Sequence, residues 1–333
     1  MEDQSKYIFS KGSLEQKDFS IDFKNEKGHA YIPIKNTKEL YLFSDCTITT
    51  KLISLIGKTG IVIHFFDYYG NYVGSFFPKE QLLSGNFIIE QSLAYINKRE
   101  IIAKAIVNGI AINIHETLYH YYRHGKVDLK DSLDYLKKDV PNLLNKDLNI
   151  NQIMMIEGTI WARFYDSFKY FLPKDFFINK RVKRPPDNPM NAMISFSNSI
   201  LYAKTITQIY QTHLNQTISF LHEPSEGRFS LSLDLSEVFK PIIVYKTIFD
   251  LVNNKKIKID KHFRKDFNYA LLNEEGMKIF ISALDERMNI SFHHPILNRK
   301  ITYKTAIKID GYKLIKYIME GKEFKPFNNY EKY

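Results

Sequence analysis

The feature that most constrains the fold is a change in the hydrophobic period near residue 84. From Lys6 to about Glu80, apolar and polar residues alternate in short runs separated by Gly, Asn and Asp, as in ELYLFSD and IVIHFFD. Alternation with a period of two, interrupted by turn residues, predicts β-strands joined by hairpins. One stretch in this region, TTKLISLIGKTG, has helical spacing and predicts a helix that ends at Gly57 or Gly60.

After Ser84 the apolar residues recur at every third or fourth position, which is the period of an amphipathic helix. The stretch QSLAYINKREIIAKAIVNGIAINIHETLYHYYRHG keeps this period and closes on Gly125. Nearly every later segment has a helical pattern, with KRVKRPPDNP as a break between two long helices. The sequence therefore predicts an α+β protein, with a small N-terminal β-sheet or β-sandwich domain (residues 1–85) followed by a larger all-α domain (residues 86–333).

The composition is that of a folded protein with a basic surface. With 333 residues, 44% of them hydrophobic, the chain can bury sizeable cores. The 47 Lys and Arg residues against 37 Asp and Glu residues give a formal net charge of +10. This balance favours a polyanionic partner such as nucleic acid or an anionic membrane, although lysines that only solvate the surface would produce it equally well.

The cysteine count and the N-terminus bear on the compartment. Cys46 is the single cysteine, which excludes an intrachain disulfide and a Cys-based zinc or iron–sulfur site. The N-terminal residues have acids before any apolar run and no small-residue cleavage site, and no segment approaches an uninterrupted apolar membrane span. We therefore expect a cytoplasmic protein that is neither secreted nor membrane-spanning.

The stretch FLHEPSEGRFSLSLDLSEVFKP places His222, Asp234 and Glu237 within an apolar helical pattern. Asp234 and Glu237 are three residues apart, so a helix turns both toward the same side. Burying an ionised carboxylate is costly unless it is paired or bound to a metal, so the two acids could share one cation. A hydrogen-bonded core histidine, with acids that only complement a helix dipole, is the alternative that this stretch leaves open.

A further acid, Glu157, interrupts the apolar segment MMIEGTIWARFYDSFKYF. The expected buried stripe of this helix consists of Ile153, Ile156, Ile160 and Phe164. Glu157 lies on or beside that stripe, where burial would raise its pKa, unless it occupies a solvated helix edge.

Together, Glu157, His222 and Glu237, with Asp234 close by, form a set of mainly oxygen donors with one imidazole. Such a set suits Mg²⁺ or Mn²⁺ better than structural zinc, and it leaves coordination positions open for water and phosphate. The sequence therefore predicts a phosphoryl-transfer site.

Two groups of basic residues flank this set. The first basic cluster consists of Lys180, Arg181, Lys183 and Arg184. The second basic cluster consists of Lys255, Lys256, Lys258, Lys261, Arg264 and Lys265. We predict that they contact DNA phosphates, which is a sequence-independent and salt-sensitive interaction, although each lysine taken alone could simply be solvated.

These segments, taken in order, resemble one family over nearly the whole chain: the first-numbered CRISPR-associated proteins, which are the integrase-endonucleases of spacer acquisition. FDYYGNYVGSFFP is similar to the end of that family's N-terminal β domain, and MMIEGTIWARFY to its first metal-ligand helix. RPPDNPMNAMISFSNSILYA resembles its Arg-Pro-Pro, Asp, Asn-x-x-x-Ser-Phe signature. HEPSEGRFSLSLDLSEVFKP resembles the pattern that supplies its remaining ligands, and RKDFNYALLNEEGMKIFISAL its later helical segment.

The resemblance implies a site and an activity. Glu157, His222 and Glu237 would bind Mg²⁺ or Mn²⁺, and Asp234 would join these ligands or orient them. The protein would be a homodimer that dimerises through its N-terminal domain, and two such dimers would clamp a small CRISPR-associated dimer that resembles an RNase. The complex would insert short foreign DNA into the double-stranded repeat array by transesterification, an antiviral function.

Two departures from the family pattern are visible: Ser197-Asn198 replaces the Gly-Tyr that many members carry, and residue 237 is Glu where some members have Asp. Neither changes the expected ligands. The alternatives to an integrase are a stand-alone metal-dependent nuclease that acts on branched DNA and a non-catalytic scaffold that binds DNA through its basic face.

Overall fold

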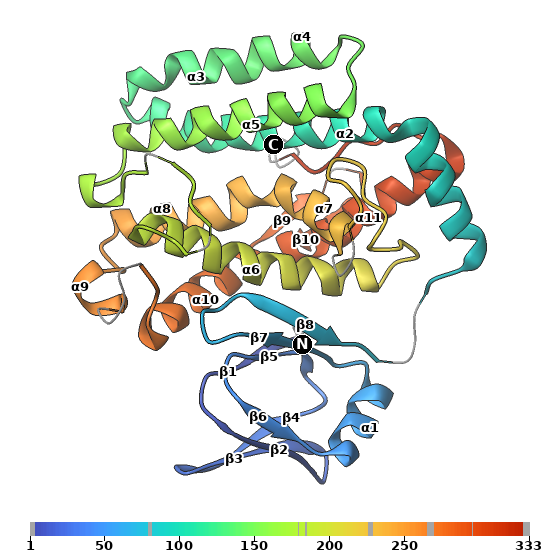
Figure 1. Ribbon diagram of the computed structural model, residues 1–333, viewed down its shortest axis with the longest axis vertical. Coiled ribbons are helices and arrows are strands. Elements are labelled where there is room, and N and C mark those ends of the chain that lie inside the picture. The colour runs from blue at the N-terminus through green and yellow to red at the C-terminus, as the bar shows by residue number, and fades with distance from the viewer. Residues whose placement is uncertain are drawn as a thin grey trace. The chain divides into compact units, whose positions relative to one another are not determined.

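The chain divides into two compact units, residues 1–81 and residues 82–333 (Figure 1). The computed structural model describes residues 4–78, 82–178, 180–183, 185–225, 229–264, 270–294 and 296–328. The first unit is built mainly of strands and the second mainly of helices, so the predicted fold class is confirmed.

The N-terminal unit contains two four-stranded sheets. One has the order β1 (Gln4–Ile8), β5 (Thr37–Leu42), β7 (Val62–Phe66), β8 (Tyr72–Phe76). The other has the order β4 (Gly28–Pro33), β3 (Ser20–Asn25), β2 (Gly12–Lys17), β6 (Cys46–Ile48). The pairs β2–β3, β3–β4 and β7–β8 are antiparallel, as the hairpin prediction requires, whereas β1–β5, β5–β7 and β2–β6 are parallel. The alternation along a strand does not specify which strand lies beside it, so the prediction missed the parallel pairs.

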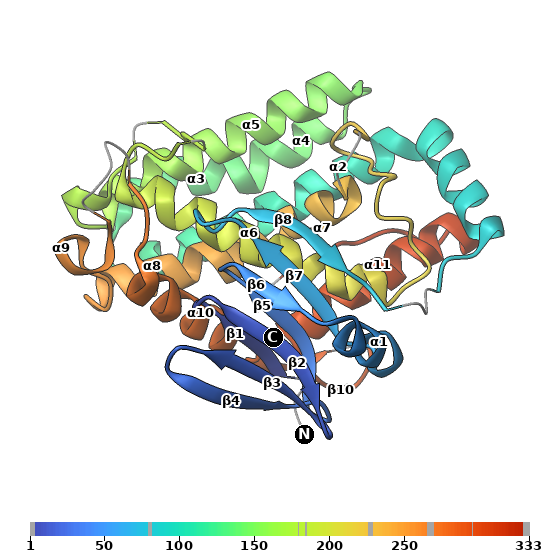
Figure 2. The same ribbon diagram turned by 60° about the horizontal axis from the view of Figure 1, so that its bottom comes forward.

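The two sheets share one hydrophobic core, and Figure 2 shows them lying against each other with α1 (Thr50–Thr59) at one end of the strands. The core residues are Ile8, Leu14, Ile21, Phe23, Leu40, Leu42, Leu52, Ile56, Ile61 and Ile63. Helix α1 ends at Gly60, the second of the two predicted positions, where φ is +76°. Glycine adopts this left-handed conformation without the steric cost of a Cβ atom, and its N–H donates to the carbonyl of Ile56 at 3.2 Å.

The second unit is mainly helical. Its longer helices are α2 (Gly85–Arg123), α5 (Ile150–Asp166), α6 (Pro189–Tyr210), α7 (Ser230–Lys240), α8 (Lys246–Asn253), α10 (Glu274–Met288) and α11 (Tyr303–Glu320). Its shorter helical segments are η1 (Val127–Leu129), α3 (Lys130–Asp134), η2 (Tyr135–Asp139), α4 (Val140–Leu144), η3 (Ser167–Tyr170), η4 (Lys174–Phe176), η5 (Pro241–Tyr245) and α9 (Ile259–His262). The description all-α is wrong in one detail, because β9 (Ser291–His294) and β10 (Arg299–Thr302) form an antiparallel pair. Strands of four residues are too short to give a clear periodic signal.

Helix α2 is the central helix of this unit and contacts α5, α7 and η5 (Figure 1). In the part of the chain that the structure describes, α2 is the one helix that is long and apolar enough to cross a membrane, and 67% of its most apolar window is buried inside the protein. Core helices of globular proteins meet the same two criteria, so this finding is weak evidence for a membrane span. Packing against the neighbouring helices explains why one face of α2 is apolar and buried.

Helices α7 and α8 belong to one helical run in which the π-helical turn η5 separates them. Pro241 opens this turn. A proline inside an α-helix lacks the N–H group and its ring clashes with the carbonyl four residues earlier, here that of Glu237. The wider π turn accommodates the ring without breaking the run, and such turns are frequent at functional sites.

Candidate active site

Asp234 is fully buried in α7, and both of its carboxylate oxygens accept hydrogen bonds from the loop that carries His222. Oδ2 accepts from the backbone N–H groups of Phe220 at 2.7 Å and Leu221 at 2.8 Å. Oδ1 accepts from the backbone N–H of His222 at 3.0 Å and from its ring Nδ1 at 2.7 Å. These contacts favour the orienting role, because Asp234 has its oxygens engaged by the loop.

The same contacts define the tautomer of His222. An ionised carboxylate can only accept hydrogen bonds, so Nδ1 of His222 carries a proton. Nε2 is therefore the ring nitrogen that can bind a cation. Burial alone would lower the pKa of His222, but the hydrogen bond to Asp234 and the negative charge of that carboxylate, followed by the charges of Glu237 and Glu157, raise it above its ordinary value.

Glu237 lies one helical turn after Asp234 and is 7% exposed. Its carboxylate forms an ion pair with the ammonium group of Lys240, three residues further along the helix. Lys240 was not among the predicted site residues. The signal that could have identified it is a basic residue placed one turn after an acid in an otherwise apolar helix, because such a pair lies on one helix face.

Glu157 lies on α5 and is half-buried. Burial, followed by the negative charge of Glu237, raises the pKa of Glu157 to about 7, while His222 and Lys240 act in the opposite direction. The charges of Glu237 and His222 therefore both act on the carboxylate of Glu157. The predicted buried face of α5 is wrong at one position, because Ile156 is only half-buried.

The chemistry of these three side chains fits a divalent cation. Besides burial, the negative charge of Glu237 raises the pKa of Glu157, and an imidazole with Nε2 available accompanies the two acids, so a bound cation would offset the repulsion at Glu157. Within the described ranges, however, no three His, Cys, Asp or Glu side chains are gathered closely enough to hold a metal ion. Glu237 is paired with Lys240 in this arrangement, so cation binding would replace one positive partner with another.

One member of the first basic cluster, Lys183, interacts electrostatically with these acids. Lys183 is exposed, but desolvation of its ammonium group by neighbouring atoms, followed by the charge of Lys240, lowers its pKa, while Glu237 and Glu157 oppose this shift. The side chain of Lys183 is thus within electrostatic range of the predicted ligands. Lys180 is exposed, and Arg184 lies outside the described residues.

Arg181 differs from Lys180 and Lys183 because its guanidinium group forms hydrogen bonds that stabilise the fold. It donates to Oδ1 of Asn191 at 3.0 Å and to Oγ of Ser195 at 2.8 Å, both on α6. Asn191 in turn donates to the carbonyl of Lys180 at 2.9 Å. The Asn-Pro-Met-Asn segment at the start of α6 therefore anchors Lys180 and Arg181, and the predicted DNA contact of Arg181 competes with this structural role.

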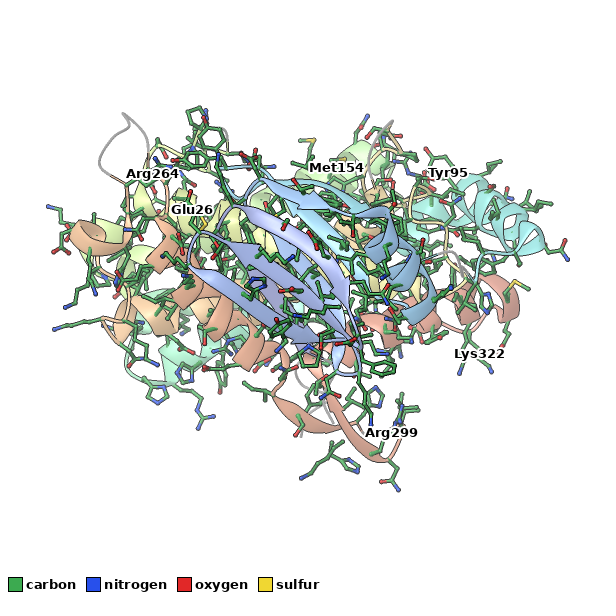
Figure 3. All side chains as sticks on the ribbon, turned by 90° about the horizontal axis from the view of Figure 1, so that it is seen from below. Glu26, Tyr95, Met154, Arg264, Arg299 and Lys322 are labelled. Carbon is green, nitrogen blue, oxygen red and sulfur yellow. The ribbon has the colours of Figure 1, made fainter. Side chains whose placement is uncertain are left out.

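The second basic cluster occupies a different place in the helical unit. Lys255, Lys256 and Lys258 are exposed, whereas Lys261 is paired with Glu275 at 2.7 Å. Helix α9 lies at one end of the unit and α7 toward the other (Figures 1 and 2). Figure 3 likewise shows Arg264 and Tyr95 at opposite ends of the unit. Lys265 lies outside the described residues.

Residues 6–286 match the sequence profile of the family described as CRISPR associated protein Cas1. The chain belongs to the Cas1 family. A Cas1 protein of Methanobrevibacter ruminantium is 43% identical over 98% of this chain and 99% of its own length. A CRISPR-associated endonuclease Cas1 of Fusobacterium nucleatum is 40% identical over 97% of this chain and 96% of its own length.

Solved structures show the same architecture. A Cas1 protein from Thermotoga maritima superposes with a TM-score of 0.84 at 32% identity and covers 96% of this chain and 98% of its own. A casposase bound to integration product superposes with a TM-score of 0.80 at 19% identity, which shows a shared fold alone. As the sequence resemblance predicted, the chain is a Cas1 endonuclease of CRISPR spacer acquisition.

Proposed function

We propose that this Cas1 protein inserts short DNA segments into a CRISPR repeat array by metal-dependent in-line transesterification. The observation that carries the proposal is the set of four hydrogen bonds between the His222 loop and the buried carboxylate of Asp234. They make Nε2 of His222 available beside two acids that interact electrostatically with the ring. A merely structural histidine would not require two further carboxylates around it.

In this proposal Glu157, His222 and Glu237 hold Mg²⁺ or Mn²⁺. When bound, such an ion stabilises the negative charge that develops on the phosphoryl oxygens. Asp234 keeps the Nδ1 proton on His222 and holds the loop in place. Lys183 and Lys240 provide positive charge next to the acids, which suits the approach of a phosphate group.

The reaction exchanges one phosphodiester for another. The 3′-oxygen of the incoming DNA bonds to a phosphorus atom of the repeat strand and loses its proton to solvent. The bond from that phosphorus to the 3′-oxygen of the repeat strand breaks, and this oxygen takes up a proton from solvent to give a new 3′-hydroxyl group. Hydrolytic nicking is the same step with water as the nucleophile.

We also propose the assembly in which this happens: a homodimer that dimerises through the N-terminal unit and acts in the cytoplasm on double-stranded DNA, with a small RNase-like dimer as partner. A solved Cas6-RT-Cas1–Cas2 complex contains a chain with the same fold, at a TM-score of 0.81 and 19% identity. That complex contains Cas2 beside Cas1, which supports a Cas2-type partner here. The net charge of +10 supports a polyanionic substrate.

The test is a strand-transfer assay with labelled short DNA, a repeat-containing target, Mn²⁺ and the small partner dimer. We expect His222→Ala to abolish strand transfer and Mn²⁺-dependent nicking while DNA binding survives. His120→Ala, a change at an exposed histidine on α2, serves as the matched control and should behave like the unmodified protein.

Two outcomes would contradict the proposal. Near-normal cleavage by the His222→Ala protein would overturn the ligand assignment. Nicking of branched DNA without strand transfer, with and without the partner, would instead favour the stand-alone nuclease.

A further inference from the structure

The loop that carries His222 is held by Arg99 of α2 as well as by Asp234 of α7. The Arg99 side chain is 11% exposed. Its Nε donates to the backbone carbonyl of Phe220 at 2.9 Å, and its Nη2 lies 2.7 Å from Oε1 of Glu223. Phe220 lies two residues before His222 and Glu223 one residue after it, so a single guanidinium group bridges both sides of the histidine.

Tyr95 supports the same guanidinium group. The Arg99 Cζ atom lies 4.8 Å from the centroid of the Tyr95 ring, and Nη1 of Arg99 donates to the Tyr95 hydroxyl at 2.9 Å. That hydroxyl donates to Oε2 of Glu223 at 3.2 Å. Arg99, Tyr95 and Glu223 therefore form a closed set of contacts in which the planar guanidinium group has little freedom to turn.

Gln91 secures the beginning of the loop. It is fully buried on α2, and its side-chain nitrogen donates to the carbonyls of Asn215 at 2.9 Å and Ile218 at 3.0 Å. Its side-chain oxygen accepts from the N–H of Asn215 at 2.9 Å. Gln91, Tyr95 and Arg99 are spaced by four residues, which places them on one face of α2, and we refer to them as the α2 clamp.

The peptide groups of Phe220 are held from both elements. Its N–H donates to Asp234, and its carbonyl accepts from Arg99. The backbone that leads into His222 is thus held by an anion on one helix and by a cation on another. Hydrogen bonds to charged groups are stronger than those between neutral groups, so both contacts restrict the position of the ring.

We propose that Arg99 is a positioning residue for His222, and that through the α2 clamp it places Nε2 for metal binding; this inference rests on the function proposed for the site. Ligands must be held within a fraction of an ångström of their working positions for full affinity. Residues that orient metal ligands typically change metal affinity or activity by about 10–100-fold when they are altered. Arg99 would belong to that class although it lies far from the ligands in sequence.

The experiment is calorimetric titration of the full-length protein with Mn²⁺, together with its thermal unfolding temperature. We expect Arg99→Met, which keeps much of the aliphatic side chain, to weaken Mn²⁺ binding by about 10-fold. Arg287→Met is the matched control: Arg287 is 16% exposed, donates to Oγ1 of Thr247 at 3.0 Å and pairs with Asp250. It should lower the unfolding temperature to a similar extent and leave the Mn²⁺ affinity unchanged.

Unchanged Mn²⁺ affinity in Arg99→Met, or an equal loss in Arg287→Met, would overturn the inference. If Arg99→Met does not fold, Glu223→Gln replaces it, because the Glu223 side chain is 64% exposed and tolerates the change. Glu223→Gln should weaken binding less than tenfold but measurably, and wild-type affinity would count against the clamp. Glu237→Gln is titrated alongside. If this variant binds Mn²⁺ normally, the assignment of the metal ligands is wrong, whereas normal binding by Arg99→Met alone contradicts only the positioning role of Arg99.

Discussion

At the scale of single residues, the site depends on which nitrogen of His222 carries the proton. The carboxylate of Asp234 can only accept, so it selects the Nδ1–H tautomer. An amide at position 234 could instead donate to Nδ1, and the ring would then carry its proton on Nε2. A protonated Nε2 has no lone pair for a metal ion, so the orienting role of Asp234 has a chemical basis as well as a geometric one.

We therefore predict that Asp234→Asn keeps measurable Mn²⁺ binding but lowers metal affinity or activity by about 10–100-fold. It should also lower the free energy of unfolding by about 2–4 kcal/mol, since the amide nitrogen meets N–H donors in a fully buried place. Calorimetric Mn²⁺ titration and chemical denaturation measure the two effects.

Glu237→Gln is the comparison for this variant, because it removes a predicted ligand in the same helix. Glu237→Gln should abolish the Mn²⁺ binding that Asp234→Asn retains. Equal and complete loss of Mn²⁺ binding in both proteins would make Asp234 a direct ligand.

At the scale of elements, the two basic clusters differ in how freely they can meet a phosphate. Lys183 lies within electrostatic range of the acids, whereas Arg181 is bound to side chains of α6. In the second basic cluster Lys255 and Lys256 are exposed. A surface that contacts DNA phosphates should therefore involve the lysines of both clusters more than Arg181.

We predict that charge reversal of Lys180 with Lys183, or of Lys255 with Lys256, weakens DNA binding alike for unrelated sequences. Each lost phosphate contact should reduce the slope of log affinity against log salt concentration by about one. Fluorescence anisotropy at several salt concentrations measures this slope. If neither double variant changes the slope, the lysines only solvate the surface.

At the scale of the whole molecule, each unit has its own hydrophobic core. The core of the N-terminal unit consists of residues between Ile8 and Ile63. In the helical unit, Phe249 packs with its ring centroid 5.0 Å from those of both Phe168 and Phe171, which joins α8 to the segment after α5. A substitution that removes packing from one core should therefore lower the stability of its own unit first.

We predict that Leu14→Ala lowers the stability of the N-terminal unit by about 2–5 kcal/mol, and that Phe249→Ala lowers that of the helical unit by about 3–5 kcal/mol. Hydrogen exchange of the full-length proteins distinguishes the two. Leu14→Ala should accelerate exchange in β2 and β3, and Phe249→Ala should accelerate it in α5 and α8. Uniform acceleration throughout the chain in both variants would show instead that the two cores unfold as one.

The sequence by itself determined the features that depend on near neighbours along the chain. The change of period after Ser84 indicated the fold class, and the glycines after an apolar helical stretch indicated that α1 ends at Gly57 or Gly60, of which the structure has Gly60. Glu157, His222 and Glu237 were predicted as ligands because polar side chains are costly within apolar segments and because the motifs around them resemble a known family. Each of these signals extends over a few residues or a motif.

Only the tertiary structure decided the contacts between distant segments. The parallel pairing of β1 with β5, the bond from Asp234 that sets the tautomer of His222, and the α2 clamp all join residues that no local period relates. Arg99 and Phe220 are 121 positions apart in the chain, and nothing in the pattern around Arg99 distinguishes it from a solvated arginine. The physical reason is that periodicity records which face of an element is buried, whereas the partner on that face is chosen by how the folded elements pack together.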